Sequence, residues 1–214
     1  MPTGSIASSL LIVAGVSFFG SLQNTVKGLI SWRHVLFFGL PGVLGTWLGA
    51  LAGLAVDPRW QLLVFALLMT VAAYMMWRAR LPDLGAPVVI RPAKVMAEGL
   101  LVGAITGFVG VGGGFLIVPA LVLLGGLSLP IGIATSLVII ALKSVVGFAQ
   151  YYFPMVEAGY EFDLKVIATM IIAGVLGSVV GSWLGTKLPK QKMQKGFALF
   201  LVVMAAVVIY QSVL

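Results

Sequence analysis

Six apolar runs, each long enough to cross a lipid bilayer as a helix, constrain this chain more than any other feature. They cover roughly residues 6–24, 35–56, 60–77, 131–153, 166–186 and 196–213, with polar segments between them. A bilayer core about 30 Å thick needs about 20 apolar residues per helix. Only 9% of the 214 residues are charged, against about 25% in soluble domains. The sequence therefore predicts an all-α integral membrane protein that crosses the bilayer several times.

A seventh apolar stretch, residues 98–124, differs from the others because glycines interrupt it. Gly110 and the three consecutive glycines 112–114 lie in its middle, and Pro119 follows. The one long polar break, residues 78–94, contains three prolines and reads as a linker. We therefore divide the chain into a first repeat (1–80), a cytoplasmic linker (81–95) and a second repeat (96–214).

The two halves resemble each other. Residues 6–10 (IASSL) align with residues 133–137 (IATSL), and the same offset pairs Ser17 with Ser144, Gly20 with Gly147 and Gln23 with Gln150. Further on, residues 42–45 and 174–177 share the sequence GVLG, and Gly49 and Gly53 match Gly181 and Gly185. Polar residues and glycines that stay in step over two helices indicate an internal duplication. The glycines spaced by four residues predict a helix-packing face.

The duplication is incomplete at its start. The second half begins with the glycine-interrupted stretch, whereas nothing precedes Ile6 to match it. Either the protein starts upstream of Met1, or the first half has lost its leading element. The expected architecture is two related halves of three helices plus a hairpin, with the leading element of the first half missing.

The distribution of Lys and Arg predicts the orientation. The linker and the loop 187–195 are basic and should be cytoplasmic, whereas the loop after Gln150 is acidic and should face outward. These placements conflict if residues 98–124 span the membrane once. They agree if this stretch enters and returns on the same side as a hairpin folded at the glycines. The hairpin would make the halves inverted copies, an arrangement that many secondary transporters use.

The glycine segment is the first candidate binding site, at Gly112, Gly113, Gly114, Phe115 and Pro119. Glycines let the backbone leave the helical conformation, and a helix that restarts at Phe115 would aim its positive end at the break, where anions bind. The alternative is close helix packing through glycine.

Lys143 is the second candidate, near the middle of the run 131–153. A cation inside the membrane is costly unless it faces a partner or water. The same run contains no acidic residue, so a bound anion is one way to neutralise the charge. The alternative is a side chain that snorkels to the interface.

The paired hydroxyl and amide residues form the third candidate group. Two symmetric half-sites are expected along a path, although such residues also join helices structurally. The group comprises Ser8, Ser9, Ser17 and Gln23 in the first half and Thr135, Ser136, Ser144 and Gln150 in the second. Thr135 and Ser136, near a helix start, are placed to donate hydrogen bonds to an oxyanion.

Several function classes are disfavoured. The chain has no Cys and a single His, His34, which we place at the interface, so neither a metal site nor a hydrolase is expected. No phosphate-binding loop motif is present, which argues against direct use of ATP. Most of the Lys and Arg residues behind the net charge of +7 lie in loops, where they set the orientation of the chain in the membrane. They do not indicate nucleic-acid binding. No cofactor is expected, and the chain is not predicted to be an enzyme.

The segment GGGFLIVP at residues 112–119, followed by ATSL at 134–137 and then Ser144 and Gly147, resembles the TauE/SafE family of membrane permeases, called sulfite exporters after some members. Members of this family usually carry the glycine-proline segment in both halves, whereas this sequence has only the second copy. The resemblance implies export of small sulfur-containing or organic anions across the bacterial plasma (inner) membrane. The expected partners are a small anionic substrate, the bilayer and, as an option, a second copy of the chain. A non-transporting subunit or an incomplete permease that scaffolds a partner is the alternative.

Overall fold

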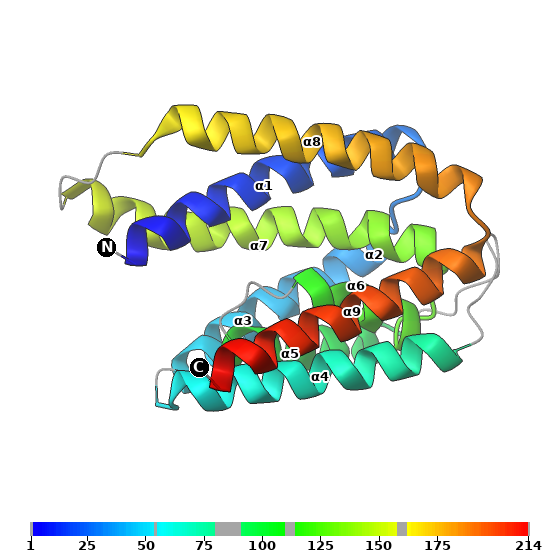
Figure 1. The fold of residues 1–214 in the computed structure, drawn as a ribbon, viewed down its shortest axis with the longest axis horizontal. Helices are drawn as coiled ribbons and strands as arrows, with labels where there is room; N and C mark the ends of the chain where they lie inside the picture. The colour runs from blue at the N-terminus through cyan, green and yellow to red at the C-terminus, as the bar shows by residue number, and fades with distance from the viewer. Residues whose placement is uncertain (1, 54, 80–90, 110–113, 158–161, 214) are drawn as a thin grey trace. The chain divides into compact units, whose positions relative to one another are not determined.

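The computed structural model describes residues 2–53, 55–79, 91–109, 114–157 and 162–213, and the regular structure in these ranges is helical. The helices are α1 (Pro2–Val26), α2 (Trp32–His34), η1 (Val35–Gly39), α3 (Leu40–Gly53), α4 (Pro58–Arg78), α5 (Pro92–Val109), α6 (Gly114–Leu123), α7 (Leu129–Glu157), α8 (Leu164–Lys187) and α9 (Lys190–Val213) (Figure 1). Seven helical segments of the described residues are long and apolar enough to cross a membrane. The predicted all-α, multi-pass membrane fold is confirmed.

Local sequence explains where these helices change or begin. The π-helical stretch η1 ends two residues before Pro41, whose missing N–H interrupts the regular hydrogen-bond ladder. Asp57 caps α4 by accepting a hydrogen bond from the backbone N–H of Arg59 at 2.8 Å, and Pro58 occupies the first turn. Asp163 caps α8 in the same way, accepting from the N–H groups of Lys165 and Val166.

The chain forms two compact units that do not coincide with the sequence repeats. Unit 1 contains Met1–Ile30 and Leu137–Lys187, and unit 2 contains Ser31–Ser136 and Leu188–Leu214. Each unit therefore combines helices from both repeats. The boundaries of the repeats themselves stay a prediction.

In unit 1, α1 runs antiparallel to its repeat equivalent α7. Gly147 lies against Leu10, and Gly20 lies against Leu137, so the start of one helix meets the end of the other. In contrast, α8 runs parallel to α1, with Gly174 against Val16. At the ends of these two helices, Lys27 Nζ donates a hydrogen bond to Ser182 Oγ at 2.8 Å.

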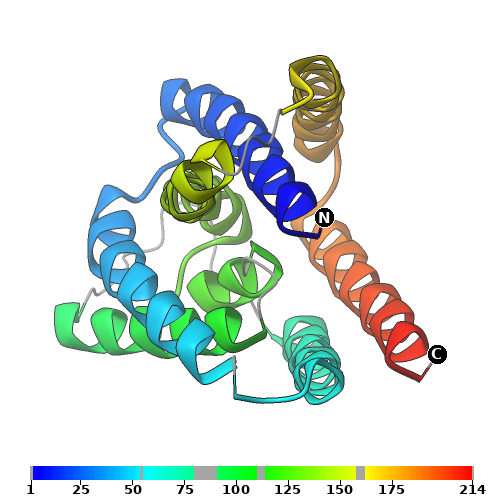
Figure 2. The ribbon, with the colours of Figure 1, turned by 90° about the vertical axis from the view of Figure 1, so that its left-hand side faces the viewer.

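Unit 2 is built around a glycine contact between α3 and α5, which cross in Figure 2. The buried glycines 42, 45, 49 and 53 of α3 face the buried glycines 99, 103 and 107 of α5. A Cβ added at Gly49 would overlap the backbone carbonyl oxygen of Ala104, and one at Gly103 would overlap that of Gly42. The packing face predicted for the first half is confirmed.

Helices α5 and α6 form an antiparallel pair. Leu124 and Gly125, directly after α6, line the same cavity as Arg91, Lys94 and Glu98 at the start of α5. The chain therefore returns to the end of unit 2 from which α5 departs. A re-entrant hairpin stays a prediction, since α5 alone is long enough to span a membrane. Of the glycines at which we placed the fold, Gly110, Gly112 and Gly113 lie outside the described residues, and Gly114 begins α6.

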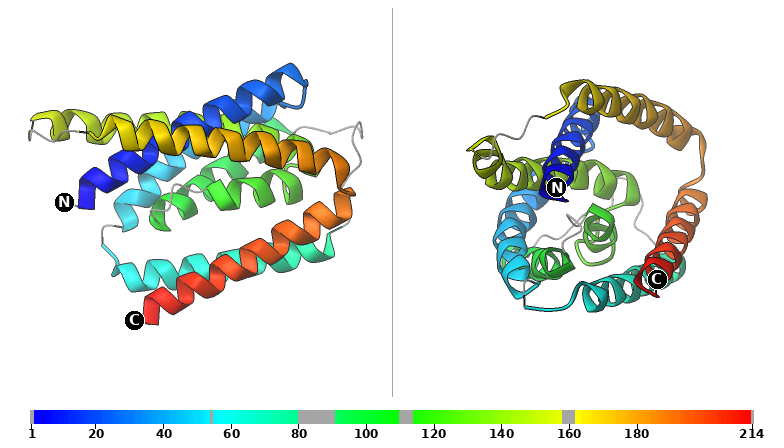
Figure 3. Two further views of the ribbon diagram at one scale, coloured as in Figure 1. Left: turned by 45° about the horizontal axis from the view of Figure 1, so that its top comes forward. Right: turned by 60° about the vertical axis from the view of Figure 1, so that its left-hand side comes forward.

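The repeat equivalents α4 and α9 also run antiparallel and lie side by side (Figure 3). The side-chain amide of Gln194, near the start of α9, donates to the carbonyl oxygens of Met76 and Ala79 at the end of α4. Both pairs of equivalent helices, α1 with α7 and α4 with α9, are thus antiparallel. This supports an inverted repeat, which stays a proposal.

We expect Gln194→Ala to lower the stability of unit 2 by about 1 kcal/mol, because the substitution leaves two carbonyl groups at the end of α4 without their donor. Thermal unfolding in detergent measures the effect. Gln191→Ala is the matched control, since Gln191 is exposed on the same helix. Equal unfolding temperatures for the two variants would contradict this role of Gln194.

Candidate functional site

Buried polar side chains are the natural starting point, because each needs a partner. Those that are less than a tenth exposed are Ser17, His34, Thr106, Ser128, Thr135, Ser136, Lys143, Ser144 and Gln194. Four buried polar atoms have no hydrogen-bond partner among the described residues: His34 Nε2, Glu98 Oε2, Ser128 Oγ and Lys143 Nζ. These four atoms mark two places, one in each unit.

Lys143 marks the place in unit 1. Its side chain is 8% exposed, and its Nζ is buried without a hydrogen-bond partner in the described part of the chain. No ion pair of the described residues includes it. The residue lies at the middle of α7, inside the candidate span Leu129–Ala149. This geometry disfavours the snorkelling alternative, because a snorkelling ammonium group reaches water.

Two hydroxyl residues predicted to face an anion are buried on α7. Thr135 is fully buried, and its Oγ1 accepts a hydrogen bond from the backbone N–H of Ser31 at 3.0 Å. Ser136 donates its hydroxyl to the carbonyl oxygen of Ile133 at 2.8 Å. Ser144, next to Lys143, is buried as well. Thr135 retains a hydroxyl hydrogen to donate, whereas that of Ser136 is occupied by its own helix.

The remaining paired residues lie in less uniform surroundings. In the first half Ser17 is buried, Ser8 and Gln23 are half-buried, and Ser9 is exposed. Gln150 lies on α7, but its side chain is outside the described residues. A pair of symmetric polar half-sites therefore stays a prediction for this group.

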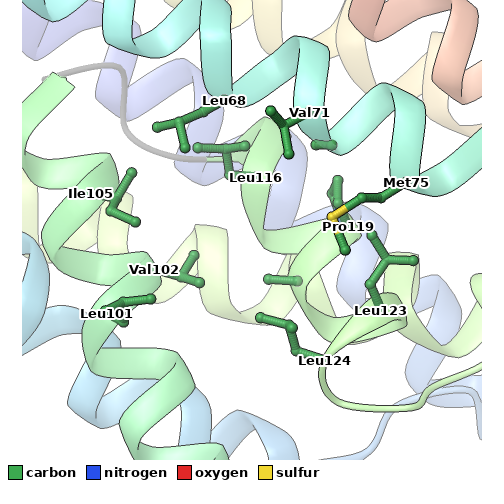
Figure 4. Close-up of a pocket in the computed structure, with 12 residues that line it drawn as sticks. Leu68, Val71, Met75, Leu101, Val102, Ile105, Leu116, Pro119, Leu123 and Leu124 are labelled. Atoms are coloured by element: carbon green, nitrogen blue, oxygen red, sulfur yellow. The ribbon is translucent and has the colours of Figure 1, made fainter.

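The glycine segment is only partly described. Gly112 and Gly113 lie outside the described residues, as does the side chain of Phe115, and Gly114 begins α6. Pro119 lies inside α6 and lines an apolar pocket of about 180 Å³ between α4, α5 and α6 (Figure 4). The labelled residues of this pocket are all apolar, so it offers an anion no hydrogen bond.

A second polar cluster, in unit 2, was not predicted from the sequence. His34, which we expected at the interface, is fully buried, and its Nδ1 is 2.8 Å from Ser31 Oγ. Its ring lies against Gly125, three residues before the buried Ser128. Glu98 and Gly125 line a common cavity of about 270 Å³. No periodicity in the sequence signals this cluster, because it depends on contacts among α2, α5 and the connection 124–128.

Basic residues gather at the same end of unit 2 as this cavity. Arg91 and Lys94 begin α5, and the cation of Lys195 on α9 lies 5.4 Å from the ring centre of Trp77 at the end of α4. In unit 1, Lys27 and Lys187 lie at the opposite end from Asp163. This distribution agrees with the predicted cytoplasmic placement of the linker and of the loop 187–195.

Comparisons with known proteins place this chain among membrane transporters. A sequence model of the family described as "Sulfite exporter TauE/SafE" matches residues 1–208. Two proteins of Xylella fastidiosa strains, each described as "Probable membrane transporter protein", are 30% identical over 218 and 220 residues. Both alignments cover 99% of this chain and 81% of the relative. No solved structure matches the chain significantly.

Proposed function

Because the chain belongs to the TauE/SafE family of membrane transporters, we propose that it is a secondary transporter that exports small sulfur-containing anions, such as sulfite or organosulfonates. The proposed location is the plasma membrane of a bacterium. The matched family description names sulfite export, and this supports the substrate class. The excess of Lys and Arg over Asp and Glu also favours attraction of anions.

The observation that carries the proposal is the buried, unpaired Lys143. An ammonium group in a low-dielectric interior is stable only when an opposite charge or water accompanies it. No carboxylate of the described residues pairs with it. A substrate anion supplies the missing charge. The charge on Lys143 therefore selects for anions over neutral solutes of the same size.

The antiparallel arrangement of repeat-equivalent helices supports a transporter mechanism. Inverted repeats let one half adopt the conformation of the other, which opens a central site alternately to each side of the membrane. The pairs α1 with α7 and α4 with α9 fit this scheme. We propose that the halves exchange conformations in this way and that the membrane potential or an ion gradient drives export.

A second candidate is a non-transporting subunit that scaffolds a partner. One observation favours it: the glycines 177 and 181 of α8 have open space around them, whereas their repeat equivalents on α3 are covered by α5. A face of small residues without a neighbour suits docking of another membrane helix. A partner that co-purifies in a fixed ratio, together with absence of anion flux for the isolated chain, would favour this candidate.

Ligand-dependent stability tests the substrate class. We expect sulfite, thiosulfate or an organosulfonate to raise the unfolding temperature of the purified protein in detergent, since a ligand that binds only the folded state stabilises it. Chloride at equal ionic strength is the control. A rise with all anions alike would leave a nonspecific salt effect as the cause, and it would contradict the proposed selectivity for sulfur-containing anions.

A further inference from the structure

A carboxylate borders the cavity at the start of α5, inside a membrane-length helix, where acidic residues are rare. Glu98 lies inside the candidate span Pro92–Val109 and is the one Asp or Glu in the seven candidate spans of the described residues. Acidic residues within membrane segments are costly and mark ion or proton pathways by default. The surroundings of Glu98 in the fold, in addition to the rarity of such residues in membrane segments, indicate its function.

The carboxylate of Glu98 is only half satisfied. Oε1 lies 3.5 Å from Lys94 Nζ, and the Glu98 side chain is 12% exposed while that of Lys94 is 62% exposed. Oε2 is buried and has no hydrogen-bond partner among the described residues. A buried acceptor oxygen without a donor is unusual in a folded protein, because most buried polar atoms have a hydrogen-bond partner. A proton bound at Oε2 would turn this acceptor into an O–H donor.

The side chain of Glu98 borders a cavity at the basic end of unit 2. Glu98, Lys94 and Arg91 line the same cavity of about 270 Å³, a volume that holds several water molecules. Because Lys94 is largely exposed, the cavity opens at the end of the unit. The side chain of Glu98 therefore lies beside a cavity that is open to the aqueous phase on that side.

The charged surroundings of Glu98 come from few elements. Arg91 directly precedes α5 and Lys94 lies on it. The buried His34 of α2 lies with its ring against Gly125, which lines the cavity. Helices α3 and α6 carry no titratable side chain, and the charged residues of α4 are at its ends. His34 Nε2 is a second buried polar atom without a partner, so two titratable groups border one connection.

We infer that Glu98 is the proton-exchanging carboxylate that couples anion movement to proton movement in this chain. A hydronium ion in the cavity gives its proton to Oε2, which forms an O–H bond and leaves water and a neutral carboxylic acid. Release of the same proton on the other side of the membrane regenerates the carboxylate. This inference rests on the proposed anion transport and adds the driving ion.

The test follows protons and anions separately in liposomes that contain the purified protein. Thiosulfate is the probe because it is fully ionised at neutral pH and does not itself carry protons. A trapped pH-sensitive dye reports proton movement, and labelled thiosulfate reports anion flux. We expect thiosulfate flux through the wild type to change the internal pH, and an imposed pH gradient to drive its accumulation.

Glu98→Gln separates the two processes. We expect this variant to retain exchange of labelled for unlabelled thiosulfate within about twofold of the wild type, while the pH change falls to that of empty liposomes. Asp57→Asn, at an exposed helix cap outside the spans, is the control and should keep both. Wild-type flux without proton movement, or an unchanged pH signal in Glu98→Gln, would overturn the inference and leave anion transport intact. Movement of Na⁺ in place of protons would overturn it as well, and absence of any thiosulfate flux would overturn the proposed function on which it rests.

Discussion

Gly49→Leu is expected to abolish recovery of the folded protein, whereas Gly181→Leu, at the equivalent position of the second repeat, is expected to be tolerated. A Cβ at Gly49 would overlap the carbonyl oxygen of Ala104, and the next contacts are backbone atoms of the same helix. Backbone cannot move aside as a flexible side chain does, so the cost exceeds the 1–3 kcal/mol or so typical of overpacked cores. Gly181 has open space around it.

The comparison uses size-exclusion profiles and thermal unfolding in the same detergent. Gly49→Leu should give aggregated or absent protein, and Gly181→Leu should give a profile like that of the wild type. Both substitutions add the same side chain to a glycine of a membrane helix, so differences in hydrophobicity or expression cancel. Similar loss in both variants would mean that α8 has a neighbour as close as α5 is to α3. A stable Gly49→Leu protein would contradict the observed α3–α5 contact.

Lys143→Met is expected to remove most of the anion transport. Met retains the length and the apolar stem of Lys but carries no charge, so packing around α7 is largely preserved. Removing one member of a buried charge pair costs about 2–5 kcal/mol, which corresponds to a loss in apparent affinity of at least about 30-fold. Initial rates of sulfite flux at a concentration below saturation measure this loss.

Lys192→Met is the matched control for Lys143, because it removes the same formal charge from an exposed position at the start of α9. Its flux should stay close to that of the wild type at moderate salt, where exposed charges are screened. If Lys143→Met retains full flux and affinity, the buried ammonium group does not bind the substrate. An equal decrease in both variants would point instead to overall charge as the factor that matters.

Much of the fold follows from patterns along the chain. The seven apolar stretches appear as helices whose ends lie within a few residues of the expected ones, apart from the earlier start of α5 at Pro92 and of α9 at Lys190. Length and hydropathy suffice here because the bilayer demands helices of about 20 residues with every backbone group satisfied. The glycine spacing in α3 likewise predicted a packing face, although not which helix it contacts.

Contacts between distant segments could not be predicted. His34 was expected at the interface, but the fold buries it against Gly125. The bridge from Gln194 to the end of α4 joins residues more than a hundred positions apart. Helices α3 and α8 have the same glycine spacing, but the glycines of α3 lie against α5, whereas Gly177 and Gly181 of α8 have open space around them. In each case the outcome depends on which helices become neighbours, and periodicity within one helix carries no information about that.

The burial of some candidate residues could be predicted from the sequence, whereas their role in binding stays a prediction. Lys143, Ser144, Thr135 and Ser136 were selected from their positions in one apolar run, and all four are buried on α7. Charge in an apolar run is a strong signal because its cost in the membrane is large. Glu98 gave a weaker signal, since it is the first residue of the apolar stretch 98–124 and follows the basic linker. Its unsatisfied oxygen becomes evident only when the return of the chain at Gly125 closes the cavity.

The most direct measurement of the central claim is sulfite flux into liposomes that contain this purified chain and no other protein. The account predicts flux that saturates with sulfite concentration, exceeds that of protein-free liposomes and is competed by thiosulfate or an organosulfonate. Flux equal to that of protein-free liposomes for every anion, from protein that is folded and inserted, would contradict the account. It would leave the scaffolding role as the better description of this chain.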